Sequence, residues 1–201
     1  MSRDSIARKL AREPPVPFAA LPEEERLALA SSDLLRDGRA GLELLETIDA
    51  AKMATFRIPG CQLTLLEMAA RCGRADVTRL IVRRCPALVT TGGPVAWAAS
   101  SGQLGIMREL IHAGANPATE KMHDGETALH HAAENGQLGA VQYLIEELGM
   151  SPLTLDEHGY DVVCILPTGM VETLASSLDI TTALYVIELF STPRSHQPLA
   201  A

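Results

Sequence analysis

The side chains that could do chemistry are few, and the most suggestive set is formed by two pairs. His123 and Asp124 form the first pair, and Glu157 and His158 form the second, with equal spacing between corresponding members. Two imidazoles and two carboxylates are a ligand set that zinc accepts in proteins. Because flexible loop tips do not hold ligands in a fixed geometry, we expect these four residues to be exposed loop residues and predict no metal site.

Other candidate groups are isolated. His130 and His131 are neighbours, and adjacent residues of a helix do not face one another, so we do not expect them to share a metal ion. The sequence contains no phosphate-binding glycine loop, no nucleophile elbow and no His-Glu-x-x-His pair. No Cys-x-x-Cys spacing relates the cysteines, which we expect to be reduced thiols: Cys61, Cys72, Cys85 and Cys164. We therefore predict no catalytic residue and no cofactor.

The composition is typical of a folded chain with a core of aliphatic side chains. Of the 201 residues, 47% are hydrophobic, 21% are charged and 3% are aromatic. So few aromatic residues argue against a β-sandwich or β-barrel and favour close-packed helices. No apolar run approaches the roughly 20 residues of a membrane span, and the N-terminus lacks a hydrophobic signal core. We expect a cytoplasmic protein with no membrane partner.

The charge is unevenly distributed along the chain. The net charge is −8, with residues 1–108 contributing +3 and residues 109–201 contributing −11. A C-terminal half this acidic repels phosphate backbones, so we expect no nucleic-acid partner. The acidity either improves solubility or forms an acidic face that attracts a basic partner.

An internal repeat organises these residues. Residues 127–136 read Thr-Ala-Leu-His-His-Ala-Ala-Glu-Asn-Gly, followed by Gln-Leu-Gly. The string Ala-Ala-x-x-Gly-Gln-Leu-Gly also occurs earlier in the chain, from Ala98 onward. Residues 64–73 repeat the same frame as Thr-Leu-Leu-Glu-Met-Ala-Ala-Arg-Cys-Gly.

These strings resemble the ankyrin repeat, a unit of about 33 residues with a hairpin-like turn, two antiparallel helices and a Thr-Pro-Leu-His-x-Ala-Ala signature. The resemblance implies an all-α solenoid of about four to five helix-turn-helix repeats with degenerate terminal caps, and it implies that His130 supports the turn through hydrogen bonds. The paired alanines would let the first helices approach closely, and Gly73, Gly102 and Gly136 would end them in a left-handed conformation. Trp97 has two interpretations, core packing, which we favour, and a binding hot spot.

The repeat frame also predicts the domain organisation. We expect a flexible arm at 1–20, a degenerate N-cap at 21–58, repeats at 59–91, 92–123 and 124–157, a degenerate repeat with an insertion at 158–190, and a disordered tail at 191–201.

The function implied by the resemblance is a non-catalytic protein-interaction module that acts as a monomer and binds a basic partner through a concave surface. The alternatives are a regulatory or assembly subunit of a larger complex, a microbial effector that mimics host ankyrin proteins and, more remotely, a metal-dependent enzyme that uses the hairpin tips. By position relative to the signature, the predicted partner-binding residues are Ser100, Ser101, His123, Asp124, Glu126, Glu134, Asn135, Glu157, His158 and Tyr160.

Overall fold

The computed structural model describes residues 40–120 and 125–167, together with residues 22, 25–28, 122 and 169. Within these residues the structure is helical, with one isolated antiparallel bridge between Leu155 and Asp161. The helices in chain order are α3 (Ala40–Thr47), α4 (Ala50–Thr55), α5 (Leu65–Arg71), α6 (Ala75–Arg84), the 3₁₀ helix η2 (Pro86–Thr90), α7 (Pro94–Ser100), α8 (Leu104–His112), α9 (Ala128–Glu134), α10 (Leu138–Gln142), its π-helical continuation η3 (Tyr143–Glu147) and α11 (Val162–Ile165).

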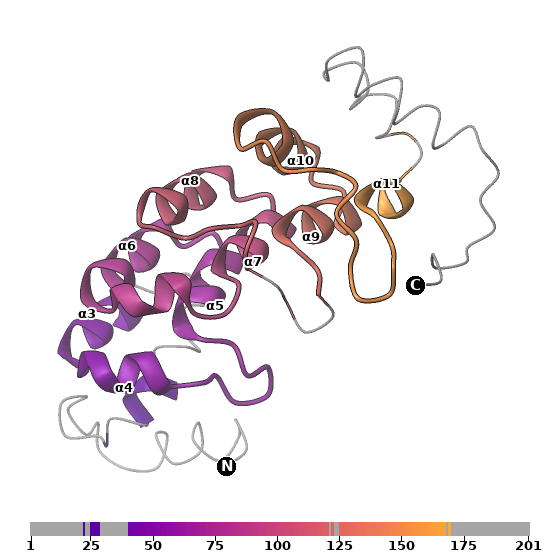
Figure 1. Ribbon diagram of the computed structural model, residues 1–201. Helices are drawn as coiled ribbons and strands as arrows, with labels where there is room; N and C mark the ends of the chain where they lie inside the picture. The colour runs from indigo at the N-terminus through magenta and orange to yellow at the C-terminus, as the bar shows by residue number, and fades with distance from the viewer. Residues whose placement is uncertain are drawn as a thin grey trace.

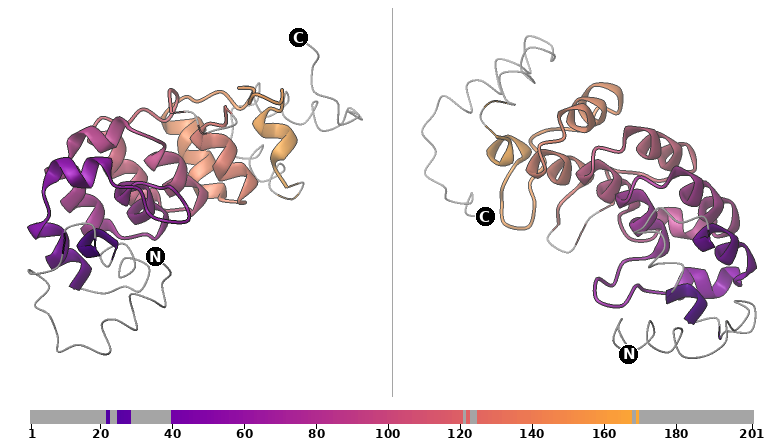
Figure 2. Two further views of the ribbon diagram at one scale, coloured as in Figure 1. Left: turned by 90° about the horizontal axis from the view of Figure 1, so that it is seen from below. Right: turned by 180° about the vertical axis from the view of Figure 1, so that it is seen from behind.

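The helices form two rows that run side by side along a curved arc (Figure 1). The short helices α5, α7, α9 and α11 form the inner row, and α3, α6, α8 and α10 form the outer row. The same two rows are visible from behind in the right-hand view of Figure 2. This arrangement confirms the expected all-α solenoid.

Close packing within the inner row depends on paired alanines. Helix α7 packs against both α5 and α9. The pairs at the contacts are completely buried: Ala69 and Ala70, Ala98 and Ala99, and Ala132 and Ala133. A methyl side chain lets neighbouring helices approach until their backbones are nearly in contact, so a larger side chain here would force the repeats apart.

Glycines end the first helix of each clear repeat. Gly73, Gly102 and Gly136 have φ angles of 75°, 68° and 67°, the left-handed region expected from the sequence. At Gly102, a Cβ atom would also collide with the Gln137 side chain of the next repeat. The positive φ is the stronger requirement for glycine here, because the end of the flexible Gln137 side chain can move aside.

The spacing between the glycines that end the first helices is not constant. Gly73 and Gly102 are closer together in the sequence than Gly102 and Gly136 are. The shorter connection contains η2 where the following repeats have a hairpin loop. On the preceding side, Arg84 donates to the carbonyl oxygens of Leu45 and Ile48 at 2.6 and 2.7 Å, which satisfies acceptors at the end of α3.

The N-termini of the inner helices are capped in different ways. Thr64 and Glu67 form a reciprocal capping box on α5, and the same carboxylate accepts a hydrogen bond from the Gly93 N–H of the next repeat at 3.1 Å. On α9, the Nδ1 atom of His130 lies 2.9 Å from the Thr127 hydroxyl oxygen. Its Nε2 atom lies 3.4 Å from the Tyr160 carbonyl oxygen. The expected support of the turn by His130 is therefore confirmed.

The middle repeat lacks both capping side chains, and Glu120 replaces them. The N-cap of α7 is Gly93, and Ala96 stands where the other repeats have Glu67 and His130. Glu120 reaches in from the following loop and accepts a hydrogen bond from the Val95 N–H at 3.3 Å. Its other carboxyl oxygen is buried and makes no hydrogen bond among the described residues. Burial, opposed by the bonds from Val95 and Ala96, raises the pKa of Glu120 to about 7.

Among the helices of the described residues, none combines the length and the apolar character that a membrane span requires. The predicted arm at 1–20, the predicted tail at 191–201 and all but the first part of the predicted repeat at 158–190 lie outside the described residues.

The alanine contacts give a first prediction. Ala133→Leu should lower the free energy of unfolding by roughly 1–3 kcal/mol, because the larger side chain has no space between α7 and α9. Chemical denaturation measures the change, with Ala113→Leu as the control, since Ala113 is exposed at the end of α8. Equal midpoints for the two variants would contradict the close helix contact.

Glu120 gives a prediction about pH. The pKa of Glu120 is about 7 in the folded state and near 4.5 when the chain is unfolded, so the folded state binds the proton more tightly. Protonated Glu120 therefore stabilises the folded state. This stabilisation is complete below pH 4.5 and is lost as the pH rises through 7. The full effect is about 3 kcal/mol, from about 1.4 kcal/mol for each pKa unit.

Glu120→Gln should remove this part of the pH dependence, so its stability relative to the parent should rise between pH 5 and pH 8. Urea denaturation across that range measures the difference. Glu146→Gln, at an exposed position of η3, is the control and should follow the parent. Parallel stability curves for Glu120→Gln and the parent would show that Glu120 does not titrate between these pH values.

Candidate functional site

A row of contacting side chains crosses the inner helices. The Arg71 guanidinium of α5 lies 5.3 Å from the centroid of the Trp97 ring on α7. The Trp97 ring in turn stacks on the His131 imidazole of α9, with centroids 6.1 Å apart and an angle of 28° between the planes. These residues occupy nearby positions on successive inner helices, so the close approach of the helices brings them together.

Trp97 is partly buried and packs against the core. The favoured interpretation of Trp97 as a packing residue is therefore correct in part, because the ring also contributes to the row on the inner helices. Its indole N–H is buried and has no hydrogen-bond partner among the described residues. The packing of Trp97 holds the His131 ring in a defined orientation.

Beyond the tryptophan, two carboxylates converge on His131. Ligand atoms of Glu126, His131 and Glu134 all lie within 4.8 Å of one another. The shortest separation joins His131 Nε2 and Glu126 Oε2, at 3.1 Å, a distance that suits an ion pair when the imidazole is protonated. The buried Nε2 atom nevertheless makes no hydrogen bond within the described chain. The ion-pair distance and the missing hydrogen bond are compatible, because an ion pair needs proximity whereas a hydrogen bond also needs alignment.

Two adjacent hairpins extend this acidic cluster. In the first, the Met122 N–H donates to the Glu126 carbonyl oxygen at 2.9 Å. In the second, Asp156 and Tyr160 make the equivalent bond at 3.0 Å. Gly125 has a φ of 71°, and a Cβ atom there would lie 3.0 Å from the Glu157 backbone nitrogen, so the two hairpins are in contact. Glu157 is thereby placed beside the residue that precedes Glu126.

The second hairpin also exposes apolar surface. Large hydrophobic residues that are exposed in the described part of the chain are Leu153, Leu155 and Tyr160, with exposed fractions of 38%, 42% and 36%. All three belong to the loop between η3 and α11. We use the name inner face for Trp97, His131, Glu126 and Glu134 together with the hairpin 153–160.

The structure brings together some of the predicted binding residues. Glu126 and Glu134 meet at His131, and Glu157, His158 and Tyr160 share the second hairpin. Ser100 and Ser101 are partly buried at the end of α7, one repeat before the exposed Glu134 and Asn135. His123 and Asp124 lie outside the described residues.

Sequence reasoning did not identify His131, Arg71 or the exposed leucines as part of this surface. One signal was available for His131, because His131 and Glu134 are three residues apart and residues with this spacing lie on one side of a helix. As expected, His130 and His131 make separate contacts. His130 is completely buried below the hairpin, whereas the side chain of His131 is 15% exposed.

Two of the thiols are at least partly buried, in surroundings that disfavour the reactive thiolate form. Burial raises the pKa of both the Cys72 and the Cys85 thiols, which leaves little thiolate near neutral pH. Cys61 and Cys164 are exposed.

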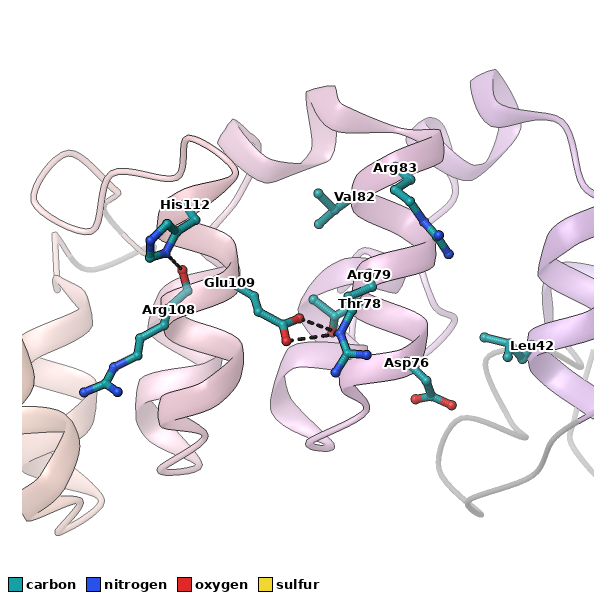
Figure 3. A pocket seen from close by; sticks show the side chains of 9 residues that line it. All are labelled: Leu42, Asp76, Thr78, Arg79, Val82, Arg83, Arg108, Glu109 and His112. Atoms are coloured by element: carbon teal, nitrogen blue, oxygen red, sulfur yellow. Dashed lines mark hydrogen bonds and ion pairs between the residues drawn. The ribbon is translucent and has the colours of Figure 1, made fainter.

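An open depression of about 820 Å³ lies on the opposite side, between the outer helices α6 and α8 (Figure 3). Within the depression, the Arg79 side chain of α6 donates to both carboxylate oxygens of Glu109 on α8, each at 3.1 Å. Arg108 points away from the depression and pairs with Glu147. These are ion pairs between exposed side chains, each worth about 0–1 kcal/mol. The Arg79–Glu109 pair occupies the depression with charges that already satisfy each other, so we do not assign a ligand site there.

Comparison with known families identifies the repeat. A model of ankyrin repeats in three copies matches residues 66–156. A comparison with curated proteins finds no match. The matched residues include most of α5, all of α6 to η3 and the inner-face residues as far as Asp156.

Proposed function

Since the chain is an ankyrin repeat protein, we propose that it is a non-catalytic interaction module that binds a basic protein segment on its inner face. Ankyrin repeats are generally protein–protein interaction modules and are typically non-enzymatic. The proposal keeps the expectations of a monomer and a cytoplasmic location. It also keeps Ser100, Ser101, His123, Asp124, Asn135 and His158 as peripheral members of the binding surface.

The proposal is supported by exposed carboxylates on the inner face that make no ion pair in the described chain. Glu134 is exposed and makes no ion pair in the described chain, and Glu157 is also exposed. On the outer helices, Glu109 and Glu147 pair with arginines, whereas Glu43, Glu46 and Glu146 are exposed acids that provide the matched control below. Acidic groups without intramolecular partners can pair with lysine or arginine from another molecule.

Charge needs an apolar contact beside it to produce a stable complex. Each exposed ion pair is worth about 0–1 kcal/mol. Several such pairs mainly accelerate association, because a field of one sign steers an oppositely charged partner. Tyr160 and Leu155, next to Glu157, supply the apolar surface that would slow dissociation. The expected partner therefore combines lysines or arginines with an aromatic or aliphatic residue.

The test starts from a displayed library of random peptides selected on the 201-residue protein, which should enrich basic sequences with an apolar residue. Association with a selected peptide is then measured for the triple variant Glu126→Gln, Glu134→Gln, Glu157→Gln. Its on-rate at low salt should fall about tenfold or more, and the salt dependence of the on-rate should weaken.

The control carries the same change in net charge on outer helices. It combines Glu43→Gln, Glu46→Gln and Glu146→Gln, all at exposed positions of α3 and η3. Its on-rate should stay near that of the parent. Enrichment of acidic peptides, or equal on-rates for the inner and outer variants, would show that the acidity of the inner face does not select the partner.

A further inference from the structure

We propose that Glu126, His131 and Glu134 form a binding site for one divalent cation of the zinc class. The site consists of one imidazole nitrogen and two carboxylate oxygens that lie within 4.8 Å of one another. Imidazole and carboxylate are both ligands of zinc, and three protein ligands with one open position are a coordination that zinc accepts. All three ligands come from one chain, so cation binding would require no protein partner.

The separations are close to those of a bound ion. Zinc lies about 2.0–2.2 Å from nitrogen and oxygen ligands, so two ligands of a tetrahedral site are about 3.3–3.5 Å apart. His131 Nε2 and Glu126 Oε2 are already 3.1 Å apart. The third ligand atom belongs to the exposed Glu134 side chain and lies within 4.8 Å of the other two.

The histidine is held ready for a ligand. The His131 side chain is only 15% exposed and stacks on Trp97, which limits rotation of the ring. Its Nε2 atom is buried and, apart from its 3.1 Å approach to Glu126 Oε2, has no partner in the described chain and makes no hydrogen bond there. A cation between the two carboxylates would satisfy this nitrogen.

Charge supports the same conclusion. Glu126 and Glu134 repel each other across a short distance, and a divalent cation would neutralise both. His131 and Glu134 come from the same helix with a spacing of three residues, while Glu126 comes from the hairpin directly before it. Two of the three ligands therefore sit on a rigid element, unlike the hairpin-tip set of His123, Asp124, Glu157 and His158 considered from the sequence.

The full chain, freed of any histidine tag and treated with a chelator, is titrated with zinc ion as the probe. Trp97 is the single tryptophan and its ring centroid lies 6.1 Å from that of His131, so its fluorescence reports on the site. We expect a saturable change in emission, and calorimetry should give one ion per chain. Cys61→Ser and Cys164→Ser are introduced throughout, because exposed thiols bind zinc on their own.

Two ligand variants decide the outcome. Glu134→Gln and His131→Gln should each weaken zinc binding at least about tenfold, since even loss of a group behind a metal ligand costs about 10- to 100-fold. Glu134 is exposed, so its variant tests the site without disturbing the fold. His112→Gln and Glu146→Gln, at exposed positions of the outer helices, are controls that should bind as the parent does. Absence of saturable binding in the parent, or binding that survives in both ligand variants, would overturn the proposal.

Discussion

The close contact between successive inner helices is the constraint on which the rest of the structure depends. The alanine pairs of α5, α7 and α9 have no exposed surface, and their methyl side chains allow these helices to pack closely. This approach gives each repeat a fixed place relative to the next. It also means that side chains at equivalent positions on neighbouring helices must meet, because no larger residue separates them.

The inner face forms because residues at equivalent positions of neighbouring repeats contact each other. Trp97 and His131 belong to different repeats and are far apart in the sequence, yet their rings stack. Arg71 covers the other side of the tryptophan, while Glu126 and Glu134 surround the histidine. The charge along the row therefore changes from basic at α5 to acidic at α9. A partner that lies along the row would experience this gradient, and a cation would favour its acidic end.

The helix N-termini show how one structural requirement is met with different chemistry. Each inner helix needs acceptors for its first N–H groups. Glu67 and His130 meet this need from within the repeat, while Glu120 meets it from the next loop. Capping from a loop places a carboxyl group in a site where it is buried and near Glu67, and both effects raise the pKa of Glu120. The pH response expected near neutrality is consequently located in the middle repeat.

Much of the fold could be predicted from the sequence, because it depends on residue types that recur at a fixed position. The Ala-Ala pairs and the glycines with positive φ follow from local requirements of the repeat, whereas the hydrogen-bonding role of His130 was implied by the resemblance to ankyrin repeats. The acidic C-terminal half and the exposed Glu134 and Glu157 were also foreseen. What the sequence determined by itself is thus the repeating unit and the sign of its charge.

Contacts between repeats were decided by the tertiary structure. No local pattern indicates that Glu120 caps a helix in the preceding part of the chain, since Gly93 and Ala96 merely lack the usual side chains. The stacking of His131 on Trp97 depends on the distance between helices, as does the convergence of Glu126 and Glu134 on the imidazole. Periodicity assigns a residue to a face of its helix, but the separation of two side chains on that face depends on how closely the backbones pack.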